Sequence, residues 1–97
     1  MNSNLKQLNN LKEFSQIIAD IKEETEVTAL LNEILTETEI NALSKRWQIL
    51  SMLAQGYTQR DIATELKVSL CKVTRGAKII KSKNSVINKY LEKEKKQ

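Results

Sequence analysis

Apolar side chains recur at intervals of three and four residues along most of this 97-residue chain. The clearest run extends from Leu5 to Ile21, and its spacing places the apolar residues on one face of a helix of about five turns. The chain contains no proline and two glycines, Gly56 and Gly76, so few residues oppose helix formation. The pattern therefore predicts an all-α fold.

Capping signals divide the chain into six expected helices. Thr36 and Glu39 have the spacing of a capping box, in which each side chain bonds the backbone N–H of the other residue. This pair predicts a helix that begins after Leu35 and ends at Gly56. The expected organisation is a single domain over 1–97, with dimerisation helices in 1–35, a core helix in 36–56, a helix-turn-helix in 58–81 and a C-terminal helix and tail in 82–97.

Residues 58–81 contain two short helical patterns separated by a tight turn. Thr58 and Ser69 are the predicted N-caps of the two helices. Lys67 stands at the turn, where glycine is common because the position takes a positive φ. The pattern predicts a helix-turn-helix whose second, basic helix enters the major groove of DNA. The alternative is an ordinary helical hairpin whose cations are solvated.

Charge is distributed unevenly along the chain. Residues 1–43 carry 3 Lys against 8 Asp and Glu, whereas residues 44–97 carry 13 Lys and Arg against 4 Asp and Glu. Binding to DNA phosphates requires such a basic segment, and it coincides with the helix-turn-helix pattern. We therefore expect duplex DNA as a partner of residues 44–97 rather than of residues 1–43.

Several other functions are disfavoured by composition. The chain has no histidine and a single cysteine, Cys71, so neither an internal disulfide nor a usual metal site is expected. An enzyme is not expected either, because no nucleophile, paired-carboxylate or phosphate-loop motif is present. No apolar run is long enough for a membrane span and no signal peptide is recognisable, so we expect a cytoplasmic protein that does not bind membranes.

The N-terminal helix presents more apolar surface than so small a core can cover. Seven large apolar residues line one face between Leu5 and Ile21. Exposed apolar surface of this extent favours association, so we expect the stripe to pack on a second copy of the chain. The alternative is a stripe that folds back on its own chain.

Three stretches within residues 35–91 are informative together: LTETEINALSKRWQIL, GYTQRDIATEL and VTRGAKIIK. On these stretches the chain resembles the Trp repressor family of bacterial regulators. The resemblance implies an intertwined six-helix dimer in which the N-terminal helices of both chains interlock. It also implies a repressor that binds a palindromic operator when L-tryptophan is bound as corepressor, with no other cofactor.

The resemblance also assigns roles to individual residues. Arg60 corresponds to a residue that reaches a guanine, while Leu70, Cys71 and Thr74 are expected to face the groove floor, where water carries many contacts in this family. The side chains expected at phosphates are those of Gln59, Ser69, Lys72, Lys78 and Lys81. The residues that the resemblance places around the amino acid are Arg46 and Arg75, which flank the indole ring, Thr36 with the backbone of Leu35 at the polar end, and Gly76, which allows close approach.

Three positions depart from the family pattern. Ile79 replaces a serine near the amino group of the ligand, and Glu33 replaces an apolar residue. The link from Gly56 to Thr58 is one residue short, which alters the expected half-site spacing. The alternative functions are a helix-turn-helix regulator without a ligand, a helical partner-binding protein, and the DNA-binding part of a mobile-element protein. The last is disfavoured because no acidic catalytic constellation follows the helix-turn-helix.

Overall fold

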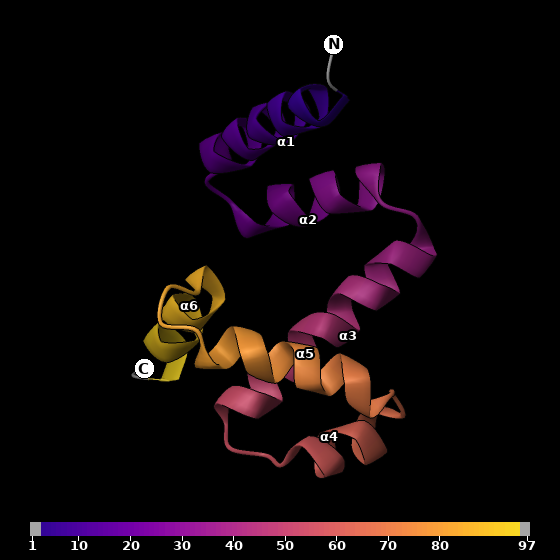
Figure 1. The fold of residues 1–97 in the computed structure, drawn as a ribbon. Helices are drawn as coiled ribbons and strands as arrows, with labels where there is room; N and C mark the ends of the chain where they lie inside the picture. The colour runs from indigo at the N-terminus through magenta and orange to yellow at the C-terminus, as the bar shows by residue number, and fades with distance from the viewer. Residues whose placement is uncertain (1–2, 96–97) are drawn as a thin grey trace. The chain divides into compact units, whose positions relative to one another are not determined.

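The computed structural model describes residues 3–95, with side chains for residues 6–91, and within this range every regular element is a helix (Figure 1). This confirms the expected all-α fold with six helices, while the intertwined dimer stays a prediction. No helix in the described range is both long and apolar enough to cross a bilayer. The helices are α1 (Ser3–Asp20), α2 (Glu24–Ile34), α3 (Glu37–Ala54), α4 (Gln59–Leu66), α5 (Leu70–Lys81) and α6 (Val86–Lys95).

The chain divides into two compact units, Met1–Ile40 and Asn41–Gln97. The boundary falls after the first turn of α3, so that helix begins in one unit and continues into the other. The expected single domain over 1–97 stays a prediction.

The capping box at the start of α3 is confirmed. The Thr36 N–H donates to Glu39 Oε1 at 2.8 Å, and the Glu39 N–H donates to Thr36 Oγ1 at 3.2 Å. The backbone and side-chain hydrogen bonds with Thr36 stabilise the carboxylate and so lower the pKa of Glu39 below its usual range. Local sequence alone therefore fixes where α3 begins.

The core of the second unit joins α3, α4 and α5. Ile49, Ile62 and Val73, one from each helix, form its buried cluster, and the last two are 0% exposed. Ala63, Leu66 and Val68 pack against this cluster from α4 and from the turn that follows it. The helix-turn-helix thus shares one core with α3, and this core fixes the direction of α5.

Gly76 lets α5 approach α3 closely. A Cβ atom added there would lie 3.1 Å from Ile49 Cγ2 and 3.2 Å from Leu53 Cδ1, tighter than ordinary van der Waals contact. Since both neighbours belong to α3, the missing side chain is what permits this packing.

The predicted caps of the helix-turn-helix are also confirmed. Thr58 Oγ1 accepts a hydrogen bond from the Asp61 N–H at 3.1 Å, and Ser69 Oγ accepts one from the Lys72 N–H at 3.4 Å. Between the two helices, Lys67 adopts φ 56° and ψ 47°, the left-handed conformation expected of the turn.

Replacing Lys67 with glycine is expected to stabilise the protein. A side chain in the left-handed region is strained, and Lys67→Gly relieves that strain by about 1 kcal/mol. Urea unfolding followed by far-UV circular dichroism measures the change. Lys78→Gly, at an exposed position in the interior of α5, is the control and is expected to destabilise by about 1 kcal/mol. A lower unfolding midpoint for Lys67→Gly than for the wild type would contradict the prediction.

The C-terminal helix is attached to the end of α5 by a side-chain bond. Asn88 Nδ2 donates to the Ile80 carbonyl oxygen at 2.7 Å, which satisfies an acceptor that the end of α5 leaves open. Leu91 is buried, but Val86 and Tyr90 are exposed. The apolar side chains of α6 are therefore only partly buried within this unit.

Candidate functional site

One face of α5 is exposed and basic. Val73, Gly76 and Ala77 are buried on the opposite side of the helix. The exposed cations of α5 are Lys72, Arg75, Lys78 and Lys81, and the helix carries no acidic residue. This face can therefore bind an extended array of negative charge.

The nine residues predicted to contact DNA lie on α4, on α5 and at the cap between them. Gln59 is half-buried and the other eight are exposed. Arg60 lies in the first turn of α4, where a long cationic side chain is free to reach outward. The fold thus brings the predicted contacts together on the helix-turn-helix.

A hydrogen bond between α4 and α5 connects two of these residues. The Thr74 hydroxyl donates to Gln59 Oε1 at 2.9 Å and also lies 3.0 Å from the Leu70 carbonyl oxygen. No local pattern predicts this bond, because its two residues are 15 positions apart and belong to different helices. The bond restrains the Gln59 side chain of α4 against α5.

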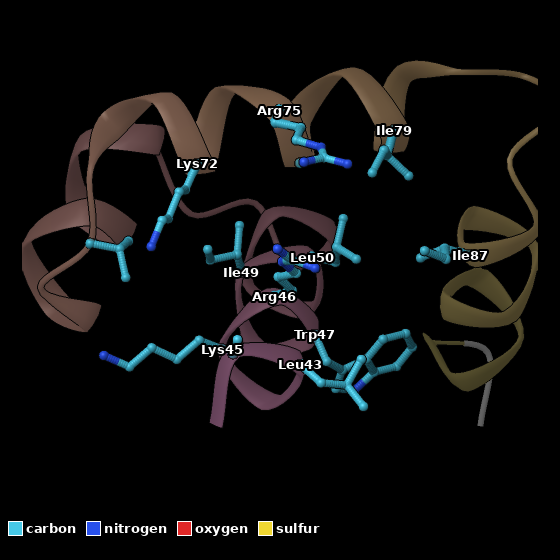
Figure 2. A pocket seen from close by; sticks show the side chains of 13 residues that line it. Leu43, Lys45, Arg46, Trp47, Ile49, Leu50, Lys72, Arg75, Ile79 and Ile87 are labelled. Carbon is cyan, nitrogen blue, oxygen red and sulfur yellow. The ribbon is translucent and has the colours of Figure 1, made fainter. Parts of the chain in front are cut away.

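A pocket of about 400 Å³ lies within the second unit, between α3 and α5 (Figure 2). Arg46 on α3 and Arg75 on α5 face the same space, with Ile79 and Ile87 toward one end and Lys45 and Lys72 toward the other. The remaining lining residues are Ala42, Leu43, Trp47, Ile49, Leu50, Val68 and Gly76.

The pocket combines apolar walls with cationic side chains. Its only charged lining residues within 41–97 are Lys45, Arg46, Lys72 and Arg75, all of them exposed. Such a site suits a ligand with an apolar body and a negative group, since guanidinium ions pair with carboxylates and stack on aromatic rings.

Comparison with known proteins identifies the family. Residues 9–95 match the family model described as Trp repressor protein. The chain belongs to the Trp repressor family. It is therefore a DNA-binding regulator of transcription, of a family that is regulatory rather than enzymatic. Searches of curated proteins and of solved structures gave no match.

Three of the five ligand residues implied by the Trp repressor resemblance line the pocket. These are Arg46, Arg75 and Gly76. Leu35 and Thr36 belong to the first unit, where Leu35 ends α2 and Thr36 caps α3, and they are not among the lining residues. Their predicted role toward a ligand stays a prediction.

The sequence did not identify the apolar walls of the pocket. Leu43 and Trp47 are both more than 40% exposed and line the pocket. Their spacing of four residues shows only a shared helix face. Ile87, from α6, has no local signal at all, because its place depends on how α6 packs on α5.

Proposed function

We propose that this regulator is a homodimeric repressor that binds a palindromic operator and takes L-tryptophan as corepressor in the α3–α5 pocket. The observation that carries the proposal is the pair Arg46 and Arg75, which face one apolar-walled space from two different helices. As a regulator of transcription it is expected to act in the cytoplasm.

The size and chemistry of the pocket suit an aromatic amino acid. Its volume of about 400 Å³ is within the range of ~300–1,000 Å³ that small-molecule sites occupy. Apolar walls such as Leu50 and Ile79 would bury an indole ring, and a guanidinium ion would stack on its face. The other arginine remains available to the carboxylate of the ligand.

The helix α5 contributes both to the pocket and to the proposed DNA surface, so ligand binding in the pocket can affect DNA affinity. A ligand held between Arg46 and Arg75 would restrain α5 relative to α3. If the restrained arrangement is the one that fits the major groove, the ligand raises DNA affinity by shifting the population toward it. Couplings of this kind typically change affinity by ~5–150-fold.

Exposed apolar residues in the first unit support the homodimer. Leu8, Leu11, Ile17 and Ile34 are each at least 50% exposed. Burying such a side chain contributes ~1.5–3 kcal/mol of favourable free energy, so a dimer in which a second copy covers these residues would be stabilised. A dimer would also present two copies of α5 to half-sites about 34 Å apart.

Isothermal titration calorimetry with L-tryptophan tests the corepressor. The wild type is expected to bind L-tryptophan and to gain at least about fivefold in DNA affinity with it. Arg46→Ala should lose most of this gain, whereas Lys83→Ala, which removes an exposed cation outside the pocket, should keep it. No heat and no gain in DNA affinity would refute the corepressor, and a monomer in sedimentation equilibrium would refute the dimer.

A second candidate is a helix-turn-helix regulator that needs no ligand. Ile79 favours it, because this apolar residue lines the pocket where the family resemblance expects a serine. The ammonium group of tryptophan would lack that partner, at a cost of ~1–3 kcal/mol. Equal DNA affinity with and without L-tryptophan distinguishes this candidate.

A further inference from the structure

The polar side chains around the α3–α5 pocket are all hydrogen-bond donors. Lys45, Arg46, Lys72 and Arg75 carry positive charge, and the remaining polar group is the indole N–H of Trp47. None of the lining residues, which all fall within the described range 42–87, has an oxygen atom in its side chain. A ligand group that must donate hydrogen bonds therefore finds no side-chain acceptor in this pocket.

The backbone around the pocket does not replace the missing acceptors. Apart from Val68, the lining residues lie in α3, α5 and α6, where a carbonyl oxygen accepts from the N–H four residues further along. The Ile79 carbonyl oxygen, at the end of α5, accepts from the Ser82 N–H at 3.2 Å. An ammonium group in the pocket would compete for carbonyl groups that are already engaged, and it would lie among four positive charges.

The cations lie toward one end of the apolar space. Ile79 and Ile87 lie toward the other end, and the two arginines face the space from opposite helices (Figure 2). Lys45 comes from α3 and Lys72 from α5, so the packing of two helices brings like charges to one end of the pocket. Like charges repel, and an anion placed near both lysines relieves that repulsion. A ligand with a single carboxylate bound by an arginine leaves this end without an anionic partner.

We infer that the α3–α5 pocket favours an aromatic acid with two negative groups over a zwitterionic amino acid. The ring lies toward Ile79 and Ile87, one negative group pairs with an arginine, and the second lies at Lys45 and Lys72. The inference deepens the proposed function and rests on it for the use of this pocket as the ligand site. It adds the charge of the ligand and assigns Lys45 to ligand binding.

Two ligands that differ in one charge test the inference. Phenylsuccinate and β-phenylbutyrate share a phenyl ring and one carboxylate, but phenylsuccinate has a second carboxylate where the other has a methyl group. Trp47 is the single tryptophan of the chain and lines the pocket, so its fluorescence measures the binding of either ligand without DNA. The wild type is expected to bind phenylsuccinate about tenfold more tightly, the lower end of what a hydrogen bond to a charged group contributes.

Variants of Lys45 test where the second negative group lies. Lys45→Gln should lose most of the preference for phenylsuccinate, whereas Lys45→Arg keeps the charge and should retain it. Lys83→Gln, which removes an exposed cation outside the pocket, should also retain it. Circular dichroism of each variant verifies that it is folded. An undiminished preference in Lys45→Gln would overturn the placement of the second group at Lys45.

Calorimetric titration with L-tryptophan separates the inference from the corepressor proposal. Equal affinity of the wild type for phenylsuccinate and β-phenylbutyrate overturns the inference, whether or not L-tryptophan binds. Tighter binding of L-tryptophan than of phenylsuccinate also overturns it, and the corepressor proposal then stands. If phenylsuccinate is preferred and L-tryptophan gives no heat, the inference stands and the corepressor proposal fails. If none of the three ligands binds, both are refuted.

Discussion

Ile62→Ala is expected to lower the free energy of unfolding by about 2–5 kcal/mol, enough to leave a domain of this size largely unfolded. Ile62 is 0% exposed and lies at the centre of the cluster that joins α3, α4 and α5. The substitution removes apolar contacts and leaves a cavity between three helices that cannot all move inward. Both terms act in the same direction, which is why the expected effect is large.

Urea unfolding at a fixed protein concentration measures this loss. Val86→Ala is the control, since Val86 is 69% exposed and its truncation should change stability by less than about 0.5 kcal/mol. For Ile62→Ala, a loss below about 1 kcal/mol, the mean for point mutants in general, would show that this cluster is not the core that holds α4 and α5 on α3.

Arg60→Ala is expected to weaken binding to a duplex that the wild type selects from a random pool by about 1–3 kcal/mol, or ~5–150-fold. Arg60 is exposed in the first turn of α4, from which a guanidinium ion can make two hydrogen bonds to guanine O6 and N7. Because this contact reads a base, the loss should be confined to duplexes that carry the guanine. Fluorescence anisotropy with a labelled duplex measures it.

Two comparisons separate base readout from simple charge. Lys72→Ala should weaken binding to all duplexes alike. It should also make the slope of the logarithm of the binding constant against the logarithm of the salt concentration shallower by about one. Lys12→Ala, on α1 in the acidic part of the chain, should leave DNA affinity unchanged. If Arg60→Ala weakens all duplexes equally, Arg60 contacts phosphate and its predicted role is wrong.

Where partners are near in sequence, prediction succeeded. The bonds between Thr36 and Glu39, and the caps at Thr58 and Ser69, join residues three positions apart, so residue type and spacing specify them. The left-handed Lys67 followed from the same reasoning, although lysine is not the residue that the turn favours. Arg75 and Gly76, which the family resemblance assigns to a ligand, both line the pocket, and their contact with a ligand stays a prediction.

Prediction from sequence was weaker where the fold joins distant residues. The spacing of Leu43 and Trp47 shows that they share one helix face, but only the fold shows that this face lines a pocket together with residues of α5 and α6. The family position of Gly76 suggested an approach to a ligand, but the structure shows first that it admits Ile49 and Leu53 of α3. Helical periodicity identifies a face without saying what will cover it.

The sequence by itself determined the helices, their caps and the basic character of α5, because these depend on hydrogen bonds and side-chain spacing within one or two turns. Only the packing of the helices makes Arg46 and Arg75 face one pocket and lets the Thr74 hydroxyl group donate a hydrogen bond to Gln59. Those outcomes require helices to pack at particular distances and angles, and packing is set by the shapes of many side chains together rather than by any local pattern.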